Sequence, residues 1–168
     1  RAHFDKYGFG LWALEVKESS QFIGFTGLSI PSFEAHFTPC VEVGWRLSFD
    51  AWGKGYATEA AKTALRYGFD VLKKQEIVSF TAESNVRSTK VMQRIGMTHD
   101  RKDDFNHPSL ESGHRLEKHV LYRIQNTTCR ILNHCDYCGS TKGTVFVHGH
   151  EQCVSCGINV SPCCDGSP

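Results

Sequence analysis

The sequence predicts a mixed α/β domain over residues 1–125, followed by a small separate module over residues 129–168. The domain is predicted because short β-rich runs, one of them alternating with period 2, are interspersed with segments of helical periodicity. The module is predicted because six of the eight cysteines lie between residues 135 and 164, where no helical period is found. A chain of 168 residues, 40% of them hydrophobic, is long enough for one core and a small appendage.

The first strands are predicted from β-rich runs. Residues 11–16 and 21–29 are separated by a short polar stretch, which is typical of a hairpin. From residue 41 to 47 apolar residues alternate with polar residues and glycine, so we expect a strand with one buried face and with Glu42 on the other face. Gly44 in the middle of this strand indicates either a bulge or a close approach of the backbone by a ligand.

The second half of the domain is predicted to add two helices and two strands. Apolar residues recur at steps of three and four from residue 57 to 72, as on one face of a helix. Residues 77–82 form a further strand, and Asn85 can cap a short helix that Gly96 ends. Residues 118–124 are predicted to be the closing strand. We therefore expect a mixed sheet with helices packed on it.

A glycine-rich loop, Gly53-Lys54-Gly55, precedes the first of these helices. Glycine accepts positive φ and lets backbone N–H groups converge on an anion at a helix N-terminus. The spacing fits neither GxxxxGK[ST] nor GxGxxG. The structural alternative is a tight strand-to-helix turn that needs glycine for its geometry alone. Such a turn explains one glycine but not Gly-Lys-Gly before a helix, so we predict a phosphate-binding loop.

With these motifs the chain resembles the GNAT N-acetyltransferase superfamily. The family's acetyl-CoA motif is Gln or Arg, two residues, Gly, any residue, then Gly or Ala, and it corresponds here to residues 52–57. Trp52 in place of Gln or Arg, followed by Thr58-Glu59-Ala60, resembles the RimJ/RimL-like branch. The resemblance covers roughly residues 9–125. The other segments in family order are VEVGWRL at 41–47, SFTAESNVRSTKVMQRIGM at 79–97 and FNHPSL…HRLEKHVLYRI at 105–124.

The resemblance implies a GNAT-like mixed sheet with flanking helices and an acetyl-CoA-dependent N-acetyltransferase. The acetyl group would pass to a primary amine of a protein N-terminus or a small molecule, by direct attack in a ternary complex. In the family, acetyl-CoA lies where two central strands splay apart. The family's opening strand and two helices would precede Arg1, so we expect an N-terminally incomplete domain. The residues implied to contact acetyl-CoA are Trp52, Gly53, Lys54, Gly55, Tyr56, Ala57, Asn85 and Ser88.

Acetyl transfer needs a neutral amine, so a general base is expected. Glu42 is the candidate base, acting through a water, because it resembles a glutamate that some relatives use in this way. The alternatives for Glu42 are a position facing solvent or a pair with Arg46. His107 and His119 lie in segments that resemble the same branch of the family. Either could act as the base or bind the acceptor. The alternative is that each is held by a backbone hydrogen bond and has no catalytic role.

The departing thiolate needs a proton or a hydrogen-bond donor. Many relatives carry a tyrosine for this purpose seven residues after the Asn of the Asn-x-x-Ser pair, and this chain has Met92 there. The Ser88 hydroxyl or a water is left as the acid. The structural alternative is that Asn85 is only a helix cap and Ser88 only a first-turn serine.

The cysteines of the tail have the spacing of a zinc ribbon. Cys135, Cys138, Cys153 and Cys156 form two CxxCG knuckles separated by 14 residues, and four thiolates of this kind complete a tetrahedral structural Zn²⁺ site. The alternative is a redox or disulfide role. A segment of about 40 residues buries little core, so a bound metal would supply its folding energy.

Charge and hydropathy exclude several partners. The formal net charge is +1, and residues 129–168 hold two basic and three acidic residues, so no nucleic-acid binding is expected. No apolar run reaches about 18 residues and no signal peptide opens the chain, so we expect no membrane association and a cytoplasmic location. The expected partners are acetyl-CoA, an amine acceptor and a protein bound through the zinc ribbon. The alternative function is a zinc-dependent protein-binding module on a degenerate acetyltransferase scaffold.

Overall fold

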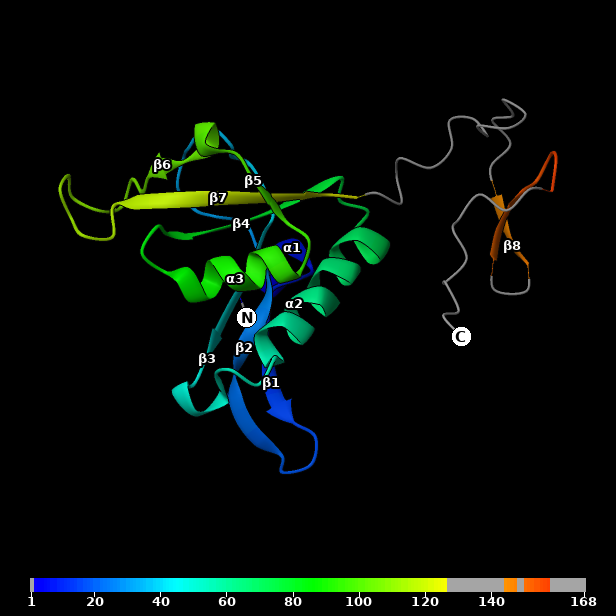
Figure 1. Cartoon of the computed structure of the whole chain (residues 1–168), viewed down its shortest axis with the longest axis horizontal. Coiled ribbons are helices and arrows are strands. Elements are labelled where there is room, and N and C mark those ends of the chain that lie inside the picture. Colours follow the sequence, from blue (N-terminus) through cyan, green and yellow to red (C-terminus); the bar gives the residue numbers. More distant parts are fainter. Residues whose placement is uncertain (1, 127–143, 148–149, 158–168) are drawn as a thin grey trace, which may run out of the picture. The chain divides into compact units, whose positions relative to one another are not determined.

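The computed structural model describes residues 2–126, 144–147 and 150–157 (Figure 1). The chain divides into two units, residues 1–125 and residues 126–168. The first unit carries a large sheet with helices, and the second carries a two-stranded hairpin. In the ranges that the structure describes, every helix is too short or too polar to cross a membrane.

A seven-stranded sheet forms the first unit, in the order β1-β2-β3-β4-β7-β5, with β6 paired to β7. Among the described strands of this sheet, β3 and β4 form the one parallel pair. The strands are β1 (Leu11–Val16), β2 (Gln21–Ser29), β3 (Glu42–Leu47), β4 (Glu76–Ala82), β5 (Thr98–His99), β6 (Phe105–Asn106) and β7 (Lys118–Gln125).

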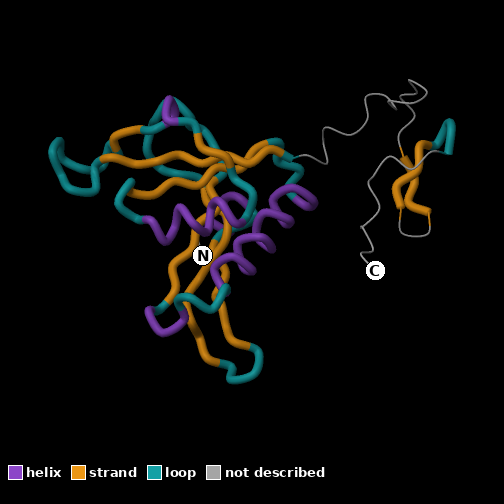
Figure 2. The backbone as a smooth tube through the Cα atoms, in the orientation of Figure 1, coloured by secondary structure: helices purple, strands orange, loops and turns teal. Residues whose placement is uncertain are grey.

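Two helices, α2 and α3, lie next to each other across the sheet (Figures 1 and 2). Their apolar faces join the sheet in one buried cluster that includes Leu65 of α2, Met92 of α3, Leu28 of β2 and Val43 of β3. This packing fixes both helices relative to the central strands. The helices and short helical turns are α1 (Ala2–Tyr7), η1 (Phe49–Ala51), α2 (Tyr56–Arg66), η2 (Tyr67–Val71), α3 (Val86–Arg94) and η3 (Arg101–Asp103).

The predicted elements agree with the structure at the hairpin and differ at the long helix. β1 and β2 have the bounds predicted from their β-rich runs. The helix predicted to reach residue 72 ends as α2 at Arg66 and continues as the π-helical turn η2. Gly68 in that turn packs so closely on Ile77 and Leu28 that a Cβ there would overlap them. The wider turn brings the backbone onto the sheet, a displacement that helical periodicity does not reveal.

The bulge considered at Gly44 is wrong. β2 and β3 keep an unbroken register, with Gly27 opposite Gly44. The irregularity lies instead between Leu14 and Glu15, where β1 pairs with β2. The short elements α1, β5 and β6 are not predicted by the local sequence patterns.

Two glycines of the first unit differ in how they respond to an added methyl group. A Cβ at Gly24 would overlap the carbonyl oxygen of Arg46, whereas a Cβ at Gly44 would lie 3.8 Å from Glu42 Oε1. We expect Gly24→Ala to lower the free energy of unfolding by about 2 kcal/mol and Gly44→Ala to change it by less than about 0.5 kcal/mol. Urea denaturation measures both. Equal losses in the two variants would contradict this assignment of close packing.

The second unit is described as an antiparallel hairpin of β8 (Thr144–Val147) and β9 (His150–Cys153). A turn over residues 154–156 follows β9, and Gly157 then has a φ of +71°. The second CxxCG segment therefore consists of the end of a strand, a turn and a glycine with positive φ. Cys135 and Cys138 lie outside the described residues.

Candidate functional site

β3 and β4 pair at a single position and then diverge. Glu42 is in register with Val78, and the Val78 amide donates to the Val41 carbonyl over 2.9 Å. Beyond this pair the strands diverge (Figure 1). A cleft of about 590 Å³ lies there, with residues 44–47 of β3 on one wall and residues 79–81 of β4 on the other. A ligand in the cleft can therefore reach the backbone of two strand edges.

The glycine loop closes one end of the cleft. Gly53 and Gly55 have φ values of +77° and +85°, and no atom lies within 4 Å of a Cβ built on either. Positive φ explains the glycines as turn residues, and the open space beside them also allows a ligand to approach. Tyr56 and Ala57, which begin α2, line the same cleft, so the first N–H groups of the helix lie beside it.

Asn85 and Ser88 form a hydrogen-bonded pair where α3 begins. Asn85 Oδ1 accepts from the Ser88 amide over 3.3 Å, which confirms the predicted cap. Asn85 Nδ2 donates to Ser88 Oγ over 3.1 Å and to Thr81 Oγ1 over 2.9 Å. Ser88 Oγ accepts from Asn85, so its own proton is available to a third group in the cleft. Met92, in the position of the relatives' tyrosine, is 1% exposed and carries no proton to donate.

Glu42 lies at the point where the strands part, and its carboxylate is largely withdrawn from solvent. Burial raises the pKa of Glu42 to about 7, opposed by the hydrogen bond that Ser29 Oγ donates to Oε2 over 3.3 Å. The two alternatives for Glu42, a position facing solvent and a pair with Arg46, are both wrong. Its partner is Ser29, and Arg46 lies over the Phe25 ring at 6.0 Å. A carboxyl group with a pKa near neutrality can exchange protons at physiological pH.

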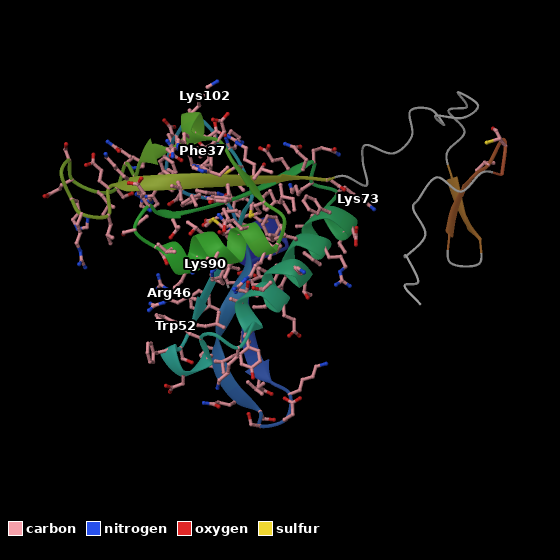
Figure 3. All side chains as sticks on the ribbon, in the orientation of Figure 1. Phe37, Arg46, Trp52, Lys73, Lys90 and Lys102 are labelled. Atoms are coloured by element: carbon pink, nitrogen blue, oxygen red, sulfur yellow. The ribbon has the colours of Figure 1, made fainter. Side chains whose placement is uncertain are left out.

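The walls of the cleft are strongly basic. Arg46 on β3 and Arg87, Lys90 and Arg94 on α3 line it, against the single carboxylate of Glu42. Figure 3 labels Arg46 and Lys90, which lie on the same side of the first unit. Several cations around one concave site favour a polyanionic ligand. Sequence reasoning missed these residues, although the spacing of three and four along residues 87–94 places the three α3 cations on one helix face.

His107 and His119 belong to an aromatic cluster. Their ring centroids lie 4.9 Å apart, and both rings contact Phe80 and Phe105. His119 Nδ1 is 3.1 Å from the Glu117 carbonyl, and burial lowers its pKa, with a further lowering from His107. Neither histidine is among the described residues that line the cleft. The geometry favours histidines held by backbone hydrogen bonds and packing.

The structure brings most of the predicted cofactor residues together. Lys54 is exposed and is not among the cleft-lining residues. Within the described part of the chain, no three His, Cys, Asp or Glu side chains converge as metal ligands. Cys135 and Cys138 lie outside that part. The predicted residues that line the cleft are Glu42, Trp52, Gly53, Gly55, Tyr56, Ala57, Asn85 and Ser88.

Comparison with known proteins gives consistent matches. A family model described as "Acetyltransferase (GNAT) domain" matches residues 1–98. The chain is 33% identical over 91 residues to the Bacillus subtilis protein YkkB, covering 54% of this chain and 52% of YkkB. It is 34% identical over 114 residues to "FsC-acetyl coenzyme A-N(2)-transacetylase" of Aspergillus fumigatus, covering 63% of this chain and 48% of that protein. The chain thus spans about half the length of both relatives.

The fold also matches that of a solved structure. An acetyltransferase from Agrobacterium tumefaciens superposes with a TM-score of 0.56 at 28% identity. The match covers 74% of this chain and 65% of the other. The match supports an α/β fold with a mixed sheet and flanking helices.

Proposed function

Because the chain belongs to the GNAT acetyltransferase family, we propose that it is an acetyl-CoA-dependent N-acetyltransferase that acts in the cleft between β3 and β4. The acceptor is a primary amine of a protein N-terminus or a small molecule, which attacks the thioester directly in a ternary complex. We further propose that the chain belongs to the RimJ/RimL-like branch, on the basis of Trp52 and the Thr58-Glu59-Ala60 segment. A cytoplasmic location is proposed with it, since acetyl-CoA is a cytosolic co-substrate.

The observation that carries this proposal is the divergence of β3 from β4 next to a glycine loop. The pantetheine arm of acetyl-CoA contains two amides, which can hydrogen-bond to strand edges as a further strand would. Its pyrophosphate is proposed to bind the N–H groups of the loop and of the first turn of α2, where Gly53, Gly55, Tyr56 and Ala57 line the cleft, and the basic walls would balance its phosphate charges. The intact cleft favours an enzyme over a degenerate scaffold that binds protein through zinc.

Glu42 is proposed as the general base. Its buried carboxyl group, with a pKa of about 7, is ionised in a large fraction of molecules at neutral pH and can take the amine's proton through a water. The N–H groups at the diverging edge of β3 are suitable donors to the developing oxyanion.

Ser88 is proposed to assist the leaving group. Its hydroxyl lines the cleft from α3 and is oriented by Asn85 Nδ2, so it can donate to the departing thiolate. A water held by the same pair would serve equally. Met92 leaves no side-chain acid at the position where relatives have tyrosine.

A direct test combines binding and turnover. Calorimetry on the full chain is expected to show acetyl-CoA binding, and a free-thiol assay is expected to show CoA release when an amine is added. Small amines are tested first, because the A. fumigatus relative is named for N(2)-acetyl transfer, and peptides with free N-termini follow. Absence of acetyl-CoA binding would refute the proposed enzyme, whereas binding without turnover on any amine would favour the scaffold.

For the second unit we propose a structural Zn²⁺ bound by Cys135, Cys138, Cys153 and Cys156, with the ribbon contacting a protein partner. The support is the paired CxxCG spacing together with the hairpin that precedes the second knuckle. Cys153 ends strand β9 of this hairpin, and Gly157, after the turn that follows, has positive φ. A metal held by both knuckles would tie the hairpin to the first CxxC segment.

Metal removal is expected to affect the two units differently. Protein purified without added metal should contain about one zinc per chain, and Cys138→Ser should lose it. A chelator should increase proteolysis after residue 126 and leave acetyl-CoA binding unchanged, because the cleft belongs to residues 1–125. Elemental analysis and limited proteolysis measure these effects. A metal-free chain under reducing conditions would exclude the ribbon.

A further inference from the structure

A large aromatic side chain is exposed at the cleft, contrary to what a purely structural role would require. Trp52 is 43% exposed and lines the cleft directly before the glycine loop. Its neighbour Phe49 is 74% exposed, with the two ring centroids 5.0 Å apart. Tryptophan that only supports a fold is buried on average, so an exposed indole at a ligand cleft indicates a contact surface.

The Trp52 ring is held in place although it is exposed. Its Nε1 donates to the Leu47 carbonyl over 2.9 Å, which fixes the indole at the end of β3. The Arg87 guanidinium lies over the ring, 4.5 Å from the centroid. Arg87 belongs to α3, so this contact joins the glycine loop to the opposite wall of the cleft. The ring is thus a fixed flat surface that a flexible guanidinium covers.

We propose, on the basis of the function proposed above, that Trp52 is the stacking surface for the adenine of acetyl-CoA and that Arg87 is displaced from it onto the 3′-phosphate. The adenosine is attached to the pyrophosphate, and Trp52 is adjacent in the chain to the loop proposed to bind that pyrophosphate. An adenine replaces a guanidinium over the same indole, since both are flat and stack on aromatic faces. The released guanidinium then gains a bidentate phosphate partner.

The exchange makes Arg87 part of the entrance to the cleft. In the free protein the Trp52–Arg87 contact spans from the glycine loop to α3. In the complex the same two residues hold opposite ends of one nucleotide. The arrangement commits the site to a ligand that carries both a purine and a phosphate, and it gives no advantage to a pantetheine thioester without them.

The test compares ligands that differ only in the nucleotide. Calorimetry is done on the full chain with acetyl-CoA, acetyl-3′-dephospho-CoA and S-acetyl-4′-phosphopantetheine. We expect Trp52→Leu to weaken both CoA thioesters about tenfold and to leave the phosphopantetheine thioester within about twofold of the parent. Trp52→Phe, which keeps a ring, should recover much of the loss. Arg87→Ala should bind the two CoA thioesters equally, whereas the parent prefers the 3′-phosphate form about tenfold.

Phe22→Ala and Arg66→Ala are matched controls, because both residues are exposed and neither lines the cleft. They should bind all three ligands as the parent does. Trp52→Leu binding acetyl-CoA as tightly as the parent would overturn the stacking proposal, and so would equal losses on all three ligands. Binding of the phosphopantetheine thioester with no preference for acetyl-CoA would overturn it while sparing the proposed enzyme. Binding of none of them by the parent would refute the enzyme itself.

Discussion

Gly55→Asp is expected to abolish measurable binding of acetyl-CoA, a loss of more than about 100-fold in affinity, and to leave the fold intact. Gly55 is the residue before α2, with a φ of +85° and open space around its Cα. Aspartate tolerates this conformation better than most residues and is a favoured residue at a helix N-terminus, so the helix should persist. Its carboxylate would lie where we propose that the pyrophosphate binds.

Gly55→Asn separates charge from shape. Asparagine has nearly the same size and the same tolerance of positive φ but carries no charge, so it should weaken binding only about tenfold. Calorimetry gives the affinities, and circular dichroism shows whether both variants are folded. If the Asp variant binds within twofold of the parent, or if Asn and Asp are equally weak, the anion site is not at this loop.

Glu42→Gln is expected to lower the turnover rate about 100-fold at pH 8 and to change the affinity for acetyl-CoA less than twofold. The amide keeps the shape and can still accept the hydrogen bond from Ser29, but it cannot take a proton. With a pKa of about 7, Glu42 is mostly protonated well below neutrality. The parent's rate should therefore fall towards that of the variant as the pH drops, leaving a few-fold difference near pH 5.5.

The same substitution should stabilise the protein at high pH. Burial raises the folded-state pKa of Glu42 from 4.5 to about 7, so the folded state favours the protonated carboxyl. Stability from this group is complete below pH 4.5 and is lost as the pH rises through 7. At pH 8 the variant should exceed the parent in free energy of unfolding by up to about 3 kcal/mol, and near pH 4 the two should agree.

Rate profiles and denaturation curves check the Glu42 assignment independently. A parent and a variant with superimposable rates from pH 6 to 9 would remove Glu42 as base, leaving bound water. A variant less stable than the parent at pH 8 would contradict the burial of an ionisable carboxylate. Denaturation requires no substrate, so the stability measurement can be made before an acceptor amine is known.

Much of the sheet could be predicted because its strands are encoded locally. The two strands of the β1–β2 hairpin are separated by a polar stretch, and β7 is a continuous β-rich run. α1 could not be predicted, since it depends on a distant contact. The Ile30 amide donates to His3 Nε2 over 3.1 Å, and His3 Nδ1 lies 2.7 Å from the Phe9 carbonyl. A histidine whose hydrogen-bond donor lies 27 positions along the chain has no local pattern.

In the candidate site, too, some features can be predicted from short sequence motifs and others depend on tertiary contacts. The glycine loop and the Asn85 cap follow from short motifs. The raised pKa of Glu42 does not, because it results from burial by elements remote in the sequence. The contact of Trp52 with Arg87 likewise joins two positions that only the packing of α3 brings together. Local residue patterns therefore predict the proposed cofactor loop, whereas the charges and pKa shifts around it depend on the tertiary fold.

The single junction between β3 and β4 has a consequence for the cooperativity of folding. It leaves the sheet as two halves, β1-β2-β3 and β4-β7 with β5 and β6, which meet in the sheet at one register position. A pantetheine arm hydrogen-bonded to both edges would join them as an added strand. Amide hydrogens of residues 44–47 would then exchange more slowly with solvent water, and the two halves would unfold more nearly as one unit. If acetyl-CoA binds as proposed, it would act as a structural member of the sheet, and the lifetime of the folded protein in the cell would rise with the supply of acetyl-CoA.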